Sequence, residues 1–210
     1  MRVLVIGANG KTGRIIVDRL REGAHDPVAM VRSEAQIQRF ADRGVDTVLA
    51  DLEEPLDPAL EGCDAVIFAA GSGSSTGPDK TLSVDRDGAV RSIAAVEEVG
   101  IQRYIMLSAM RADPESEGDP ISHYLRAKGI ADEHLIRSDL DWTIVRPGRL
   151  TDEPGTGRVR VAPRIETSGS VTRSDTAAVL VAALDHPSAS RRRFDLLEGD
   201  IPIATALDGL

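Results

Sequence analysis

Three glycines near the start of the chain have a spacing that could hold a phosphate group. Gly7, Gly10 and Gly13 follow an apolar run at residues 3–6 and precede an amphipathic stretch. Between a strand and a helix, such glycines permit a tight turn, a close approach of backbone N–H groups to a pyrophosphate, and close helix packing. The spacing is Gly-x-x-Gly-x-x-Gly, so the prediction depends on this context. The residues expected to contact a dinucleotide here are Gly7, Asn9, Gly10, Lys11, Thr12 and Gly13.

The end of the second apolar run, residues 28–31, indicates which dinucleotide to expect. An acidic residue at this point binds a ribose 2′-hydroxyl, whereas an arginine accommodates a 2′-phosphate. The run is followed by Arg32 and Ser33, a guanidinium that can clamp a phosphate and a hydroxyl that adds a donor. We therefore expect NADP(H) rather than NAD(H). By their positions at the ends of the next two runs, the residues expected beside the adenosine are Asp51, Leu52, Ala69, Ala70 and Gly71.

A tyrosine and a lysine lie four residues apart in the second half of the chain. Tyr124 and Lys128 fall in a predicted helix, residues 121–137, where this spacing puts both on one face. An ammonium group there could stabilise a phenolate, so that the tyrosine could transfer a proton. With two tyrosines and three lysines in the sequence, a chance pair of this spacing is uncommon. The alternative is a half-buried tyrosine beside a solvated lysine.

The elements that would position these residues alternate along the first 150 residues. Short runs rich in valine and isoleucine are separated by helix-length segments, which is typical of a parallel sheet buried on both faces. The predicted strands are residues 3–6, 28–31, 47–50, 65–70, 104–107 and 142–145. The predicted helices are residues 12–21, 34–43, 81–99 and 121–137, and the link after the third strand is expected to be short and irregular. The pattern predicts a doubly wound α/β fold with helices on both faces.

Residues 151–210 have a different sequence pattern and are expected to form a small C-terminal cap. They contain an alternating run at residues 158–161, a helical run at 174–184 and a short strand at 193–197. No composition break marks a linker. We therefore expect one domain over residues 1–210, with a dinucleotide-binding core at 1–150 and a substrate-side cap at 151–210.

Composition excludes several classes of function. The chain has 210 residues with 41% hydrophobic positions, enough for one sizeable core. Its net charge of -9 disfavours nucleic acid as a partner. Cys63 is the only cysteine, so an intramolecular disulfide is excluded, and a reducing, cytoplasmic location is expected. The longest uncharged stretch, residues 65–78, is too short to span a membrane and contains many small residues, so no membrane partner is expected.

Two other catalytic patterns are weak. Residues 73–77 match the Gly-x-Ser-x-Gly nucleophile elbow, but the segment is rich in glycine and serine and does not turn directly into a helix. The four histidines have no chelating spacing, so no metal site is expected.

Together these motifs resemble the short-chain dehydrogenase/reductase superfamily, in an atypical NAD(P)-binding branch that includes NmrA-like proteins and flavin and biliverdin-IX-beta reductases. Residues 84–88, 141–148 and 173–177 also carry the resemblance. It implies a Rossmann-like fold in which Ser108 bonds a substrate carbonyl, Tyr124 transfers a proton and Lys128 holds the nicotinamide ribose. It also implies that Pro147 and Gly148 pass close to the nicotinamide.

The resemblance implies an NADP(H)-dependent oxidoreductase that transfers hydride to a small carbonyl, quinone or flavin-like acceptor. One departure is that residues 83–88 have aspartate where the family's catalytic asparagine is expected. The alternatives are a non-catalytic NADP-binding sensor or interaction protein and, with little sequence left for a substrate domain, a nucleotide-sugar epimerase or dehydratase. The substrate would be selected by residues 71–80, 110–120 and 151–167. Either a monomer or a dimer is compatible with the sequence.

Overall fold

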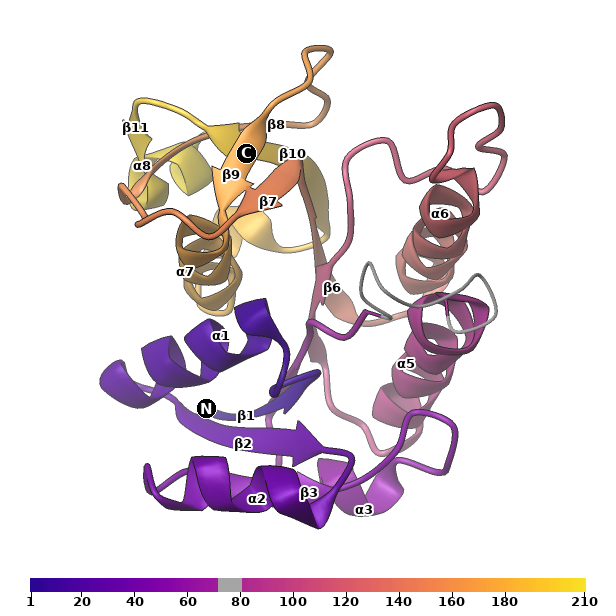
Figure 1. Cartoon of the computed structure of the whole chain (residues 1–210), viewed down its shortest axis with the longest axis vertical. Helices are drawn as coiled ribbons and strands as arrows, with labels where there is room; N and C mark the ends of the chain where they lie inside the picture. Colours follow the sequence, from indigo (N-terminus) through magenta and orange to yellow (C-terminus); the bar gives the residue numbers. More distant parts are fainter. Residues whose placement is uncertain (72–80) are drawn as a thin grey trace.

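The computed structural model describes residues 1–71 and 81–210, and its central feature is a nine-stranded, mostly parallel sheet (Figure 1). The strand order is β11-β8-β10-β6-β5-β4-β1-β2-β3. The strands are β1 (Arg2–Ile6), β2 (Asp26–Val31), β3 (Asp46–Leu49), β4 (Ala65–Phe68), β5 (Arg103–Leu107), β6 (Asp141–Pro147), β8 (Arg158–Ala162), β10 (Arg192–Glu198) and β11 (Ile201–Pro202). Strands β1–β6 and β10 run parallel, while β8 and β11 pair antiparallel at one edge.

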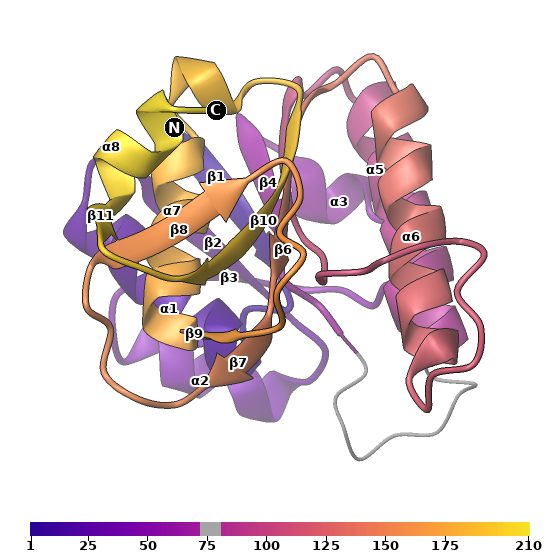
Figure 2. The ribbon, with the colours of Figure 1, turned by 90° about the horizontal axis from the view of Figure 1, so that it is seen from above.

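Helices cover both faces of this sheet, which confirms the doubly wound α/β fold (Figures 1 and 2). One face packs against α1 (Lys11–Glu22), α2 (Glu34–Ala41), α7 (Arg173–Ala183) and α8 (Ile203–Asp208). The other packs against α3 (Asp57–Leu60), α5 (Ala89–Glu98) and α6 (Ser122–Arg137). No helix of the described residues combines the length and the apolar character needed to cross a membrane.

The strand β1 shows why this sequence forms a sheet buried on both sides. Its side chains alternate, so that Val3 and Val5 join the core on the α1 face while Leu4 and Ile6 join the core on the α5 face. All four are fully buried. A continuous apolar run, rather than a strict alternation with polar residues, is the sequence pattern of such a strand.

The order of the strands creates a crevice at one end of the sheet. The chain moves outward from β1 to β2 and β3, then returns to place β4 on the other side of β1. At this point the helices that follow β1 and β4 lie on opposite faces, and the loops at the carboxyl ends of the two strands diverge. The predicted phosphate loop begins at Gly7, directly after β1.

Several elements differ from the expectation. Strand β4 ends at Phe68, two residues early, because the backbone of Ala69 and Ala70 turns over Gly7, where an added Cβ would lie 2.6 Å from Ala70. The irregular link after β3 includes the short helix α3. The predicted helix at 81–99 begins as a π-helix, η1 (Thr81–Gly88), before it continues as α5.

The residues expected as a small cap are integrated into the sheet. Strand β10 pairs parallel with β6, and β8 pairs antiparallel with β10. A separate two-stranded sheet joins β7 (Arg149–Thr151) to β9 (Ser170–Thr172), and a short 3-10 helix, η2 (Pro187–Ala189), precedes β10. The chain after residue 150 therefore builds the edge of the same sheet.

Candidate functional site

The glycine loop connects β1 to α1 in a conformation that depends on two of its glycines. Gly7 has a φ of +84°, a value that favours glycine. A Cβ on Gly13 would lie 2.2 Å from the carbonyl oxygen of Gly7, so α1 can approach the loop this closely only with glycine there. Gly10 is the N-cap of α1 and has no side-chain capping bond. The loop therefore leaves backbone N–H groups of the first turn available for an anion.

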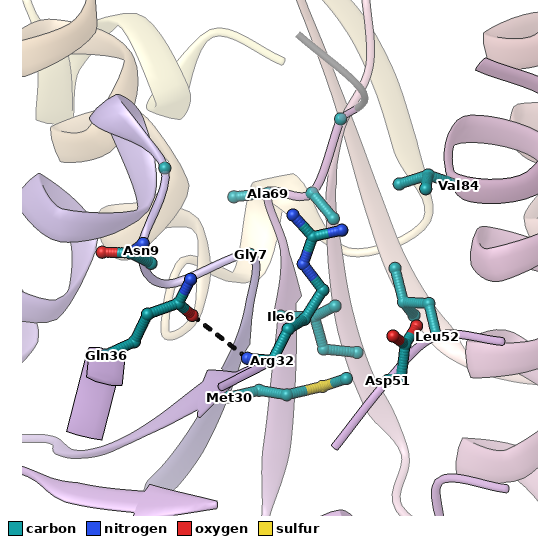
Figure 3. Close-up of a pocket in the computed structure, with 13 residues that line it drawn as sticks. Ile6, Gly7, Asn9, Met30, Arg32, Gln36, Asp51, Leu52, Ala69 and Val84 are labelled. Atoms are coloured by element: carbon teal, nitrogen blue, oxygen red, sulfur yellow. Dashed lines mark hydrogen bonds between the residues drawn. The ribbon is translucent and has the colours of Figure 1, made fainter. Parts of the chain in front are cut away.

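A cavity of about 450 Å³ opens at the crevice between β1 and β4 (Figure 3). The predicted cofactor residues that line it are Gly7, Asn9, Gly10, Arg32, Asp51, Leu52, Ala69, Ala70 and Gly71. Ile6, Met30, Gln36 and Val84 complete the lining and were not predicted. The closeness of Gly7 to Ala70 and the open N-terminal turn of α1 fit an extended dinucleotide, whose phosphates need close backbone contact.

Arg32 lies at the carboxyl end of β2, and its exposed side chain extends into the cavity (Figure 3). Its backbone N–H donates a 3.1 Å hydrogen bond to Oε1 of Gln36, which holds the start of α2 against the end of β2. Ser33 is the N-cap of α2 and makes no side-chain capping bond. Arg32 therefore lines the cavity, whereas Ser33 lies outside its lining, and a phosphate contact by either residue stays a prediction.

Other predicted cofactor residues lie outside the cavity lining. Thr12 and Gly13 are buried in the first turn of α1. Lys11 points away, because its Nζ forms a 2.6 Å ion pair with Asp152, which also pairs with Arg173 at 2.6 Å. Lys11 and Asp152 are largely exposed, so this link between the glycine loop and the segment after β7 is weak.

Tyr124 and Lys128 lie on one face of α6, as predicted. The Lys128 side chain is 4% exposed, and its Nζ lies 3.1 Å from Oδ1 of the fully buried Asp85 on η1. It also lies 3.4 Å from the carbonyl oxygen of Ala70 and 3.3 Å from that of Leu107. Because Ala70 lines the cavity, Lys128 joins the tyrosine helix to the cofactor cavity.

Ser108, at the end of β5, lies beside a second buried acid on α6. Its hydroxyl donates to Oδ2 of Asp132 at 2.9 Å, and Nε of Arg146 donates to the same oxygen at 2.7 Å. Asp132 is fully buried and lies one turn after Lys128. Asp132 and Arg146 were not predicted from the sequence, although Asp132 continues the four-residue spacing of Tyr124 and Lys128.

Burial and these neighbours determine the acidity of the cluster. Burial raises the pKa of the Tyr124 phenol; Lys128 opposes this shift, while Asp85 and Asp132 add to it. Burial by itself would lower the pKa of Lys128, but Asp85, with Tyr124 and Asp132, outweighs it, and the pKa lies above its ordinary value. Burial also raises the pKa of Asp132, against the effect of Arg146 and Ser108. At neutral pH, Tyr124 is therefore a phenol and Lys128 an ammonium ion.

Pro147 is the last residue of β6, and Gly148 follows it. The carbonyl oxygen of Pro147 accepts a hydrogen bond from the N–H of Met110 at 2.9 Å, and the N–H of Gly148 donates to Leu196 on β10 at 3.0 Å. A Cβ on Gly148 would lie 2.5 Å from the carbonyl oxygen of Gly169. The end of β6 is thus held between the segment after β5 and the C-terminal strands.

A family model described as NAD(P)H-binding matches residues 7–187. The chain belongs to this NAD(P)H-binding family. Membership confirms the NAD(P)-binding branch expected from the sequence. It also agrees with the glycine loop and the cavity at the carboxyl ends of the strands, so the cofactor is a nicotinamide dinucleotide.

Relatives of the family match the chain over its whole length. A Bacillus subtilis protein described as the uncharacterized sugar epimerase YhfK is 46% identical, with all of both chains covered. A solved structure from Bacillus halodurans, provisionally described as an NAD-dependent epimerase/dehydratase, is 46% identical, covers all of both chains and has a TM-score of 0.96. The oxidoreductase ylbE from Lactococcus lactis is 27% identical, with 100% of this chain and 96% of that chain covered and a TM-score of 0.89.

The two other catalytic patterns considered from the sequence were a nucleophile elbow and a metal site. The Gly-x-Ser-x-Gly match at 73–77 lies outside the described residues, as does most of the expected substrate segment 71–80. Among residues 1–71 and 81–210, no group of three or more histidine, cysteine, aspartate or glutamate side chains could hold a metal ion.

Proposed function

We propose that this protein is an NADP(H)-dependent oxidoreductase that reduces a small carbonyl, quinone or flavin-like acceptor. One observation carries the proposal: Lys128, four residues from Tyr124, contacts the carbonyl oxygen of Ala70, which lines the cofactor cavity. The helix that carries the proposed proton donor therefore contacts the wall of the cavity proposed to hold the dinucleotide. The oxidoreductase name of the Lactococcus lactis structure agrees with this reading.

Different residues of the chain would bind the cofactor, donate the proton and contact the acceptor. The glycine loop and the start of α1 would bind the pyrophosphate, and Arg32 with Ser33 would bind a 2′-phosphate. When bound, the reduced nicotinamide supplies a hydride. Tyr124 would give its proton to the acceptor atom that becomes negative, since its phenol is protonated at neutral pH. Pro147 and Gly148 would border the nicotinamide, and Ser108 would border the acceptor.

The proposal is tested in two steps. NADPH, NADH and their oxidised forms are first compared in thermal unfolding, where a ligand at a hundredfold excess over its Kd adds about 2.7 kcal/mol to the free energy of unfolding.

NADPH oxidation is then followed with FMN, menadione and 9,10-phenanthrenequinone. For acceptors that need a proton, Tyr124→Phe should lower kcat by about 10²–10⁴-fold and leave NADPH binding intact. An unchanged kcat with every acceptor would remove Tyr124 from the reaction and leave direct hydride transfer.

A nucleotide-sugar epimerase or dehydratase is the second candidate, because the Bacillus subtilis relative carries an epimerase name. In this chain the residues after 150 form β8, β10 and β11 of the main sheet together with α7 and α8. UDP-glucose incubated with catalytic NAD⁺ separates the two, because an epimerase converts the sugar without net consumption of the cofactor. Binding of NADPH without any turnover would favour the sensor.

Partners, oligomeric state and location stay predictions. We propose a small-molecule substrate, no nucleic-acid or membrane partner, and a cytoplasmic location, on the grounds of charge and composition.

A further inference from the structure

The buried pair of Lys128 and Asp85 uses up the hydrogens that Lys128 could offer to a cofactor. An ammonium group has three N–H donors. Its three acceptors in the protein are Oδ1 of Asp85 at 3.1 Å and the carbonyl oxygens of Leu107 and Ala70 at 3.3 and 3.4 Å. Both side chains of the pair are almost fully buried, at 4% and 0% exposure. The charge of Lys128 is therefore balanced inside the protein.

Ser108 is engaged in a similar way. A serine hydroxyl has one proton, and that of Ser108 is donated to Asp132, whose carboxylate also accepts from Arg146. The hydroxyl of Tyr124 makes no hydrogen bond to another residue of the described chain, and its side chain is half-buried. Of the three expected catalytic residues, Tyr124 is thus the one whose proton is available to an acceptor.

The charges around Tyr124 come in opposite pairs. Nζ of Lys128 lies 5.9 Å from the centre of the Tyr124 ring, with the Asp85 carboxylate 3.1 Å from the same nitrogen. Asp132, on α6 as well, is paired with Arg146 of β6. Among the described residues, the charged groups that act on the phenol are Lys128 and Asp132 of α6 and Asp85 of η1. A balanced pair acts on a third group far more weakly than a single charge, because its two contributions nearly cancel.

We propose that Asp85 is a positioning residue that holds Lys128 in a balanced pair, so that Tyr124 keeps its proton until an acceptor takes hydride. The inference rests on the proposed function. With a carbonyl acceptor, the carbon gains a hydride with its electron pair from the reduced dinucleotide, and the C=O π bond breaks. The Tyr124 O–H bond breaks as its proton goes to the carbonyl oxygen, and water returns a proton to the phenolate.

The ionisation of Tyr124 can be measured without any cofactor or acceptor. The sequence has two tyrosines, so protein labelled with 3-fluorotyrosine gives two ¹⁹F NMR signals, and fluorination lowers the phenol pKa into a range where proteins stay folded. Tyr104 is fully buried and bonded to Ser92 at 2.7 Å, and burial raises its pKa. Tyr124→Phe assigns the two signals. Circular dichroism at each pH confirms that the protein remains folded.

A double-mutant cycle tests the balance of the pair. Lys128→Met leaves the Asp85 carboxylate and should move the Tyr124 titration to higher pH, because a negative charge disfavours the phenolate. Asp85→Asn leaves a lone ammonium and should move it to lower pH. The combined variant, which removes both charges and avoids a lone buried ion, should titrate close to the unmodified protein. A combined variant that titrates as high as Lys128→Met would overturn the proposal, as would a Tyr124 that titrates below an exposed fluorotyrosine in the unmodified protein.

Asp87→Asn is the matched control, because Asp87 is two residues from Asp85, more exposed, and paired with Arg86 at 2.7 Å. It should leave the Tyr124 titration unchanged. In the NADPH oxidation assay, the alkaline loss of kcat should follow the same order of variants. A cycle that behaves as expected in protein that reduces none of the three acceptors would contradict the proposed function but leave the balanced pair standing.

Discussion

The hydrogen that each side chain can offer decides what it can do at this site. Lys128 and Ser108 have the residue types expected of a ribose and a carbonyl ligand, but their hydrogens point to Asp85 and Asp132. Residue type and position alone would therefore suggest more hydrogen-bond donors for a ligand than these two residues offer. Arg32 is the opposite case, because its exposed side chain lines the cavity and its guanidinium makes no hydrogen bond to another described residue.

Arg32→Ala should weaken NADPH binding about ten- to a hundredfold, because a hydrogen bond to a charged group contributes about 1.5–3 kcal/mol. NADH, which has no 2′-phosphate, should bind almost as before. Both Kd values are measured by fluorescence titration at one salt concentration. Arg21→Ala is the control, since this arginine lies in the last turn of α1, away from the cavity. An equal loss for both dinucleotides would remove the phosphate role of Arg32.

At the scale of elements, two short pieces of chain set the geometry of the site. The loop between β1 and α1 brings the helix against Gly7, and the helix α6 presents Tyr124, Lys128 and Asp132 at successive four-residue intervals. The π-helix η1 matters as well, because its Asp85 reaches Lys128. Wide helical turns of this kind are rare and are frequently found at functional sites.

Gly13→Ala should destabilise the protein by about 1–3 kcal/mol, because its Cβ would overlap the carbonyl oxygen of Gly7 and force the loop and α1 apart. Gly10→Ala is the matched comparison: its added Cβ would lie 3.2 Å from the same oxygen, and the residue lines the cavity. It should cost less stability and yet weaken NADPH binding. Urea unfolding and dinucleotide titration separate the two effects, and equal stability losses would contradict this account of the loop.

At the scale of the whole molecule, the end of the sheet opposite the site is tied together by a buried arginine. Arg103, the first residue of β5, donates to the carbonyl oxygen of Leu184 at 3.2 Å and that of Asp141 at 2.7 Å, and to Oγ1 of Thr143 at 2.8 Å. It also donates to the carbonyl oxygen of Ala183 at the end of α7. One guanidinium thus joins β5, β6 and the C-terminal end of α7.

Arg103→Met should lower the free energy of unfolding by roughly 2–4 kcal/mol, because it leaves buried carbonyl groups without donors. NADPH binding to the folded protein should persist, since the change lies at the amino end of β5 and the cavity at the carboxyl ends. Arg193→Met provides the comparison, because its ion pair with Glu133 is partly exposed and contributes at most about 1 kcal/mol. Loss of NADPH binding in folded Arg103→Met protein would show that the two ends are coupled.

The sequence alone was sufficient for the core of the fold and for most of the cofactor cavity, because both follow from local patterns. Apolar runs such as Val3–Ile6 specify strands through burial of both faces. Glycines after the first strand, and Arg32 after the second, are placed by the rule that parallel strands end at one edge. The four-residue spacing of Tyr124 and Lys128 is likewise a local property of a helix.

The tertiary structure decided what depends on contacts between distant segments. Strand β10 pairs in parallel with β6. No local pattern in the sequence of β10 specifies which strand becomes its neighbour. The partners of Lys128 and Ser108 come from η1 and from a later turn of α6, and Arg146 reaches Asp132 from another strand. A buried ion needs a counter-charge beside it. Only the packing of η1, α6 and the sheet brings Asp85 to 3.1 Å from Lys128. Whether Lys128 acts on Tyr124 as a single charge or as half of a pair is therefore a property of the folded molecule.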